Sequence, residues 1–229
     1  SKYFQSPKLY RENGFKKEED AKVLIDELRD YKEGVVLKTE KKKEVKNPPL
    51  LFNLAEAQNE CSKRFKISPD ETLKIIQELY EKKLVTYPRT DARVLSGAVA
   101  KEIDKNIKGL CKFPLLADFA NDILNKGTYK NISKTKYVND SQITDHYAII
   151  PTGFGNINSL GRLQALIYEL ICRRFFAIFY PPAVYQKFAI KFGIGDEIFI
   201  TNTKFCIERG FLDVVNQLKE DDEGVENQN

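Results

Sequence analysis

The chain has 229 residues and a formal net charge of +4, and 42% of its residues are hydrophobic while 31% are charged. That balance is typical of a folded protein with its own core and excludes an intrinsically disordered chain. The last stretch, 213–229, holds six acidic residues and one basic residue, so the remainder is more basic than the total suggests. A basic body is compatible with a polyanionic partner.

Other protein classes fit the composition poorly. The four cysteines form no C-x-x-C pair and the chain has one histidine, so a Cys/His zinc site is not expected. The longest apolar stretch is interrupted by Glu169, Arg173 and Arg174, so we expect no membrane span. No signal peptide opens the sequence, and we expect a cytoplasmic protein with reduced, buried thiols.

The first part of the chain predicts one helix and one strand. Residues 18–32 combine acidic residues in the first turn with apolar residues at helical spacing. Residues 35–45 follow as a strand that is rich in lysine, and this run is either a solvated strand edge or a DNA contact. Pro48-Pro49 breaks the chain and marks a domain boundary.

Residues 53–84 have a sharply defined pattern of two helices. Asn53 and Glu56 form a capping-box pattern for a helix that ends near Phe65. The run 68–71 (Ser-Pro-Asp-Glu) opens a second helix, and a strand is expected to begin at Leu84. Helix, tight turn, helix and strand are typical of a winged-helix or helix-turn-helix module, although an ordinary helical hairpin gives the same pattern.

The second half of the chain predicts further helices and then strands. The polar stretch 128–146 is expected to be a loop with a short strand. A hairpin turn at 193–196 joins two alternating segments. Helices are expected at 97–108, 114–125 and 160–179, and strands at 185–192, 198–201 and 204–208.

One stretch has the residue types of a phosphate-cleaving site: Leu84-Val85-Thr86-Tyr87-Pro88-Arg89-Thr90-Asp91. Side chains alternate along a strand, so Tyr87 and Arg89 are expected to share a face. A phenol can attack a phosphate while a guanidinium neutralises the non-bridging oxygens. A free tyrosine has a pKa of about 10, so it needs a cationic neighbour such as Arg89. The same residues also fit a plain strand end in which Arg89 pairs with Asp91.

The only histidine lies in a second stretch, Ile143-Thr144-Asp145-His146-Tyr147-Ala148-Ile149-Ile150-Pro151-Thr152. His146 could donate a hydrogen bond to a phosphate oxygen or transfer a proton to a leaving hydroxyl. It could equally be a surface or core residue without a chemical role.

Together the two stretches resemble the type IA DNA topoisomerases. Tyr-Pro-Arg-Thr-Asp after a Lys-Leu-Val-Thr strand is similar to the active-site tyrosine motif of that family. Asp-His-Tyr-Ala-Ile-Ile-Pro-Thr is similar to its histidine motif, in the form of the bacterial topoisomerase III branch. Segments 48–54, 95–100 and 173–182 resemble other parts of the family, so the resemblance spans roughly residues 1–215.

The resemblance implies an α+β fold of two domains. A mainly helical, winged-helix-like active-site tyrosine domain would span 47–152. It would be inserted in a discontinuous, β-rich arch domain made from 1–46 and 153–215. Residues 216–229 would form an acidic linker.

The resemblance also implies a reaction. Tyr87 would cleave one DNA strand and become linked to the 5′ phosphate, with Arg89 and His146 at the same phosphate. Thr90 and Arg93 are further candidates for DNA contacts. The released 3′ hydroxyl could reverse the reaction without ATP, in agreement with the absence of a G-x-x-x-x-G-K-[ST] motif. The expected substrate is DNA with single-stranded segments, and the fragment is expected to be monomeric.

The family's Mg²⁺ site lies on a Toprim domain with a D-x-D-x-E motif, which this sequence does not contain. We therefore expect a central fragment that binds no metal itself and is inactive alone, with Mg²⁺ bound in the full-length enzyme. Two alternatives remain at this point. One is a non-catalytic helix-turn-helix DNA-binding module, and the other is a purely structural domain.

Overall fold

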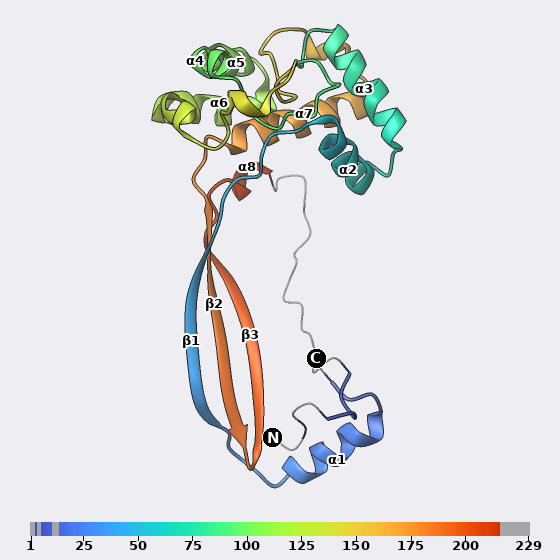
Figure 1. The fold of residues 1–229 in the computed structure, drawn as a ribbon, viewed down its shortest axis with the longest axis vertical. Coiled ribbons are helices and arrows are strands. Elements are labelled where there is room, and N and C mark those ends of the chain that lie inside the picture. Colours follow the sequence, from blue (N-terminus) through green and yellow to red (C-terminus); the bar gives the residue numbers. More distant parts are fainter. Residues whose placement is uncertain (1–2, 4–5, 11–13, 216–229) are drawn as a thin grey trace. The chain divides into compact units, whose positions relative to one another are not determined.

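The computed structural model describes residues 3, 6–10 and 14–215, and these fall into two compact units (Figure 1). The sheet unit contains the described residues of 1–46 together with 184–208. The helical unit contains residues 47–183 and the described residues from 209 onward. The first boundary between the units lies between residues 46 and 47, one residue before Pro48-Pro49. The predicted acidic linker, 216–229, lies outside the described residues.

The sheet unit is built on three strands in the order β1-β2-β3. β2 and β3 are antiparallel, and Gly195 in the turn between them has a φ of +58°, a conformation that glycine adopts readily. β1 pairs with β2, and the two strands predicted at 198–201 and 204–208 are one continuous strand. The elements are α1 (Glu18–Leu28), β1 (Val35–Lys46), β2 (Ala183–Ile194) and β3 (Glu197–Glu208).

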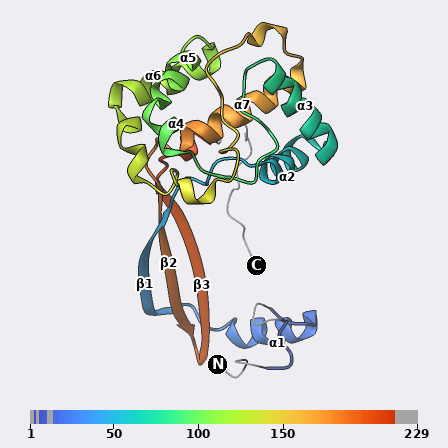
Figure 2. The same cartoon turned by 45° about the horizontal axis from the view of Figure 1, so that its top comes forward.

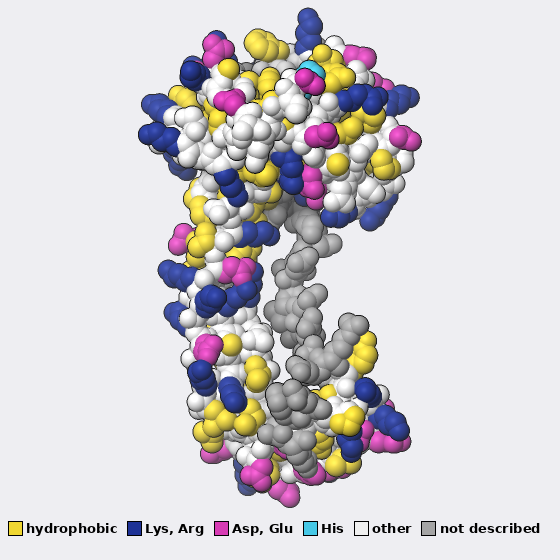
Figure 3. All heavy atoms as spheres, viewed as in Figure 1, with side chains coloured by type: hydrophobic (Ala, Val, Ile, Leu, Met, Phe, Trp, Pro, Cys, Tyr) yellow, Lys and Arg dark blue, Asp and Glu magenta, His cyan; other side chains and the backbone are white. Residues whose placement is uncertain are grey.

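The lysine-rich strand β1 is solvated. Apart from the half-buried Glu44, every side chain of the strand is exposed. Lysine and arginine side chains are accordingly visible along the surface of the sheet unit (Figure 3). The structure is consistent with the solvated-edge interpretation of this run, and a DNA contact there stays a prediction.

The helical unit contains the capped helices that the sequence predicts. The Asn53 side chain accepts a hydrogen bond from the Glu56 amide, and the Ser68 side chain accepts one from the Glu71 amide. The helix predicted at 97–108 is divided at Glu102 into α4 and α5. The helices are α2 (Leu54–Phe65), α3 (Pro69–Glu81), α4 (Gly97–Lys101), α5 (Ile103–Leu110), α6 (Pro114–Lys126), α7 (Arg162–Ala177) and α8 (Leu212–Val215), with 3-10 turns at Thr128–Lys134, Asp140–Gln142 and Ile157–Ser159.

Helix α7 lies at the centre of the helical unit, between α3 and α6 (Figure 2). Ile167, Ile171, Phe175 and Phe176 of this helix are fully or almost fully buried in the core. This packing explains why the unit extends to residue 183 and does not end at 152, where the sequence places the second boundary. The apolar stripe of α7 is buried within the helical unit, where α7 contacts α3, α6 and α8.

The winged-helix arrangement is not confirmed. Between residues 47 and 182 the described backbone forms only isolated β-bridges, among them Val85 with Pro151 and Phe52 with Ile149. The strand expected from Leu84 is therefore a single bridge. Pro88 and Pro151 lack the amide hydrogens that a longer ladder would need. The coarser α+β class is what the structure shows.

Two expectations from the composition concern membrane spans and thiols. No helix in the described part of the chain is long and apolar enough to span a membrane. All four cysteines are free, and Cys61 and Cys172 are buried. Cys111 is only half-buried and Cys206 is exposed on β3, so the expectation of buried thiols is wrong for these two.

Candidate active site

The two motifs predicted to carry chemistry lie side by side in the helical unit. The Thr86 amide donates to the Ile150 carbonyl at 3.0 Å, and the Thr86 hydroxyl donates to the Ala148 carbonyl at 2.9 Å. The same hydroxyl accepts a hydrogen bond from the Ile150 amide. Thr86 directly precedes Tyr87, so these bonds fix the tyrosine segment against the histidine segment.

Tyr87 and His146 are neighbours in space although they are far apart in the sequence. Their ring centroids are 4.5 Å apart with an angle of 43° between the rings. Tyr80, from the last turn of α3, contacts the Tyr87 ring edge-on at 5.4 Å. The half-buried phenol is therefore held between two rings. These residues line a cavity of about 540 Å³, whose other lining residues are Glu81, Lys83, Val85, Thr86, Tyr147 and Thr152.

Thr90 connects the segment after Tyr87 to the segment of His146. Its side chain is buried, and its hydroxyl donates to the His146 carbonyl at 2.9 Å. The same oxygen accepts a hydrogen bond from the Ala92 amide at 3.1 Å. With both partners inside the protein, the hydroxyl anchors the His146 segment, and the prediction that Thr90 contacts DNA gains no support from these bonds.

Arg89 is exposed and is not among the residues that line the cavity. It makes no hydrogen bond or ion pair with any other described residue, so the pairing with Asp91 considered above is not formed. The reason given for a shared face with Tyr87 also fails, because residues 86–91 form no regular strand. What the structure leaves is an unpaired guanidinium two residues after the tyrosine.

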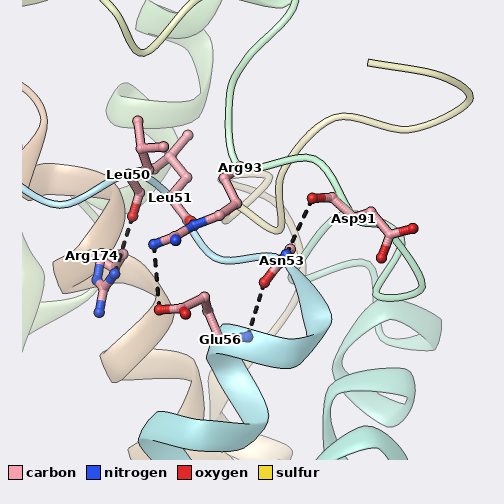
Figure 4. A network of polar contacts seen from close by, with 7 residues as sticks. All are labelled: Leu50, Leu51, Asn53, Glu56, Asp91, Arg93 and Arg174. Atoms are coloured by element: carbon pink, nitrogen blue, oxygen red, sulfur yellow. Dashed lines mark hydrogen bonds and ion pairs between the residues drawn. The ribbon is translucent and has the colours of Figure 1, made fainter. Parts of the chain in front are cut away.

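Arg93 belongs to a network of polar contacts that also includes Leu51, Asn53, Glu56 and Asp91 (Figure 4). Its Nε donates to the Leu51 carbonyl and its guanidinium pairs with Glu56, both at 3.3 Å. The cap residue Asn53 uses its amide nitrogen to bond the Asp91 carbonyl at 3.1 Å. These contacts commit Arg93 to the scaffold, and the prediction that it binds DNA gains no support from them.

Arg174 of α7 contacts the segment 50–53, which Arg93 also contacts at the Leu51 carbonyl. It donates to the Leu50 carbonyl at 3.1 Å, and its guanidinium lies 4.1 Å from the centroid of the Phe52 ring. Burial lowers the pKa of Arg174 to about 10. The segment 50–53, helix α2 and the loop after Tyr87 are thereby connected to the buried core helix.

Lys83, the first residue of the Lys-Leu-Val-Thr segment, lines the cavity, and the sequence analysis assigned it no role there. Its φ of +63° is left-handed, a conformation that disfavours an L-residue by roughly 1–2 kcal/mol. The Lys83 amide bonds the Tyr80 carbonyl and the Leu84 amide bonds the Leu79 carbonyl, which is the Schellman ending of α3. Glycine usually occupies the left-handed position of a Schellman ending. The signal that the sequence offered for this position was therefore a lysine at the end of the helix.

The described residues do not fit a magnesium site. They include no group of three or more His, Cys, Asp or Glu side chains that could hold a metal ion. Among the described residues, Glu81 is the only carboxylate that lines the cavity. Mg²⁺ prefers several oxygen ligands in octahedral geometry, which one carboxylate cannot supply.

Comparisons with known proteins agree with the two motifs. Residues 2–228 match a family model described as DNA topoisomerase. The chain is 34% identical over 196 residues to a DNA topoisomerase 3 from Bacillus cereus, and 36% identical over 194 residues to one from Bacillus subtilis. These alignments cover 85% and 84% of this chain. They cover 26% of each relative, so the chain spans about a quarter of their length.

A solved structure shows the same fold. The full-length topoisomerase I from Thermotoga maritima superposes with a TM-score of 0.61 at 23% sequence identity. The match covers 90% of this chain and 33% of that protein. At this identity the likeness concerns the fold alone.

Proposed function

The chain belongs to the DNA topoisomerase family, within the type IA enzymes, and on that premise we propose that it contributes the tyrosine half of a strand-cleaving active site. Tyr87 is the proposed nucleophile. The helical unit is the proposed active-site tyrosine domain, and the sheet unit is the proposed part of the arch domain.

The proposed step is a phosphoryl transfer to Tyr87. The phenol oxygen forms a bond to phosphorus, and the bond from phosphorus to the 3′ oxygen breaks. The leaving oxygen takes up a proton and becomes a 3′ hydroxyl, while the 5′ phosphate stays on the tyrosine. Phenolate, with a pKa of about 10 for its conjugate acid, leaves more easily than an alkoxide. The 3′ hydroxyl can therefore reverse the step without ATP.

Two side chains are proposed to serve the phosphate. His146 faces the Tyr87 ring at 4.5 Å, close enough to donate to a non-bridging oxygen or to protonate the leaving oxygen. Arg89 has no partner among the described residues, and its guanidinium can bind two phosphate oxygens at once. Thr90 would act through His146 by holding the carbonyl of that residue.

One observation carries this proposal: Tyr87 and His146 meet at a single cavity through loops that Thr86 and Thr90 join. A surface tyrosine and a surface histidine without a function would not require such a connection. We propose that a DNA strand reaches both groups through this cavity.

The helix-turn-helix alternative is less well supported. Helix α3 would be the recognition helix, and it carries four acidic residues, Asp70, Glu71, Glu78 and Glu81, against one lysine. Such a helix repels the phosphate backbone, whose neutralisation supplies most of the affinity of DNA-binding proteins.

The wider properties of the enzyme are part of the same proposal. We expect single-stranded segments of DNA as the substrate, a monomeric chain and a cytoplasmic location. Magnesium would neutralise charge at the cleaved phosphate. Because the described residues offer no site for the ion, we expect other parts of the full-length protein to hold it.

The test uses a full-length protein that contains this chain. Tyr87→Phe removes only the nucleophilic oxygen, so the covalent adduct with a 3′-labelled single-stranded oligonucleotide should disappear while binding stays unchanged. Adducts are trapped by denaturation and counted on a gel. Tyr129→Phe removes the hydroxyl of another half-buried tyrosine, outside the cavity, and should form adducts normally. A full yield of adduct from Tyr87→Phe would overturn the assignment.

A further inference from the structure

We propose that Lys83 forms a second phosphate-binding point of the cavity, at which its ammonium group binds the DNA backbone beside the phosphate that Tyr87 attacks. The proposal rests on the proposed function, because it takes DNA as the ligand of the cavity. It adds a role for Lys83, the first residue of the Lys-Leu-Val-Thr segment, to which the sequence analysis assigned none.

The backbone of Lys83 is fixed from two sides. The Schellman bonds hold it to the last turn of α3, and the Thr152 hydroxyl donates to the Lys83 carbonyl. Thr152 ends the histidine stretch, so the same contact joins the two halves of the site. A left-handed residue held in this way has its side chain direction set by the fold and not by the flexibility of a loop.

The charge of Lys83 is unpaired. The neighbouring Lys82 directs its ammonium to the Ser159 carbonyl at 3.3 Å. Lys83 has no hydrogen bond or ion pair through its side chain with any other described residue, and it is exposed at the rim of the cavity. The other charged or titratable groups at the cavity, apart from the tyrosines, are Glu81 and His146, and Glu81 accepts a hydrogen bond from Gln77. An ammonium group that has no partner among the described residues and lines the same cavity as Tyr87 favours a phosphate in that cavity.

The chain offers a matched control. Lys66 is the other non-glycine residue with a positive φ among the described residues, at +58°. It is also exposed, unpaired within the described chain and located at the end of a helix, in this case α2. It does not line the cavity. The two lysines therefore differ chiefly in whether they lie at the proposed active site.

The experiment compares Lys83→Gly with Lys66→Gly in a full-length protein that contains this chain. Glycine relieves the left-handed strain, so both variants should unfold at the same temperature as the parent or a higher one. Only Lys83→Gly should lose affinity for a single-stranded oligonucleotide, by about 3- to 10-fold at low salt. The slope of log affinity against log salt should become shallower by about 0.7, as expected for one lost phosphate contact.

A further variant protects the test against misfolding. Lys83→Gln keeps the length of the side chain and removes the charge, and it should show the same change of slope. Lys83→Arg should keep the parental slope. If Lys83→Gln retains the parental affinity and slope, or if Lys66→Gly loses as much as Lys83→Gly, the proposal is overturned.

The result is separable from the test of Tyr87. Parental salt dependence in Lys83→Gln, with adducts still lost in Tyr87→Phe, would remove the Lys83 contact and leave the proposed function standing. If Lys83→Gln binds the oligonucleotide more weakly and with less salt dependence while Tyr87→Phe still forms adducts, then Lys83 contacts DNA but Tyr87 is not the nucleophile.

Discussion

The two units of this chain are stabilised in different ways. In the helical unit the buried side chains are almost all apolar, and they surround Phe175 and Phe176 of α7. Among the described residues of the sheet unit, the buried side chains are the polar Gln186 and Glu197, while Val36 of β1 is 63% exposed. Burial of apolar surface therefore supports the helical unit, and backbone pairing with surface contacts supports the sheet.

This difference bears on where chemistry can be located. A phenol that must meet a phosphate needs a position fixed within a fraction of an ångström, and a packed core around its loops supplies this. The proposed residues Tyr87 and His146 both lie in the helical unit. The sheet unit buries little apolar surface and is expected to open locally at lower free energy.

The largest expected effect is a loss of stability in the helical unit on core truncation. Phe175 is fully buried and its ring contacts those of Phe176 and Phe179, so Phe175→Ala should lower the free energy of unfolding by about 3–5 kcal/mol. Phe205 on β3 is 56% exposed, and Phe205→Ala should lower it by less than about 1 kcal/mol. Urea unfolding followed by far-ultraviolet circular dichroism measures both. Equal losses would contradict the comparison of the two units.

A smaller effect is expected from Asn53, which caps α2 and supports the loop after Tyr87. Asn53→Ala removes the cap of α2 and the bond to the Asp91 carbonyl, so it should destabilise the helical unit by about 1–2 kcal/mol. Ser68→Ala removes only the cap of α3 and should lower the free energy of unfolding by about 1 kcal/mol. Only the first contact reaches the loop after Tyr87, so only Asn53→Ala should also slow formation of the covalent adduct. A similar slowing by Ser68→Ala would show that the cap acts through stability alone.

These contacts also show which parts of the fold could be predicted. The caps at Asn53 and Ser68 and the turn at Gly195 depend on neighbouring residues, so the sequence pattern indicates them correctly. The membership of α7 in the helical unit depends on packing between distant segments, and the continuity of β3 depends on its pairing with β2. Neither leaves a local signal.

The candidate site divides in the same way. The residue types in the motifs of Tyr87 and His146 pointed to phosphate chemistry, and the two rings do meet, although their roles stay a prediction. The bond from Thr90 to the His146 carbonyl joins distant segments and could not be read from either motif. Lys83 lies in the Lys-Leu-Val-Thr segment before Tyr87, but its left-handed backbone follows from the way α3 ends and could not be read from that segment.

The smallest expected effect concerns the surface ion pairs of the sheet. Glu44 of β1 contacts Lys187 of β2 and Lys204 of β3, the latter at 2.6 Å, so one carboxylate connects three strands. Its hydrogen bonds, first to Lys187 and then to Lys204, lower its pKa from 4.5 to about 2. Because the pKa of Glu44 is lower in the folded chain, its ionised carboxylate stabilises the sheet fully at pH values above the pKa of the unfolded chain. This contribution is lost as the pH falls through about 2. Glu44→Gln should therefore speed amide hydrogen exchange in β1 near neutral pH, relative to intrinsic rates, by a modest factor that added salt reduces. Below pH 2 the variant and the parent should exchange alike. An effect that persists there would mean that the side chain supports the sheet through packing and not through its charge.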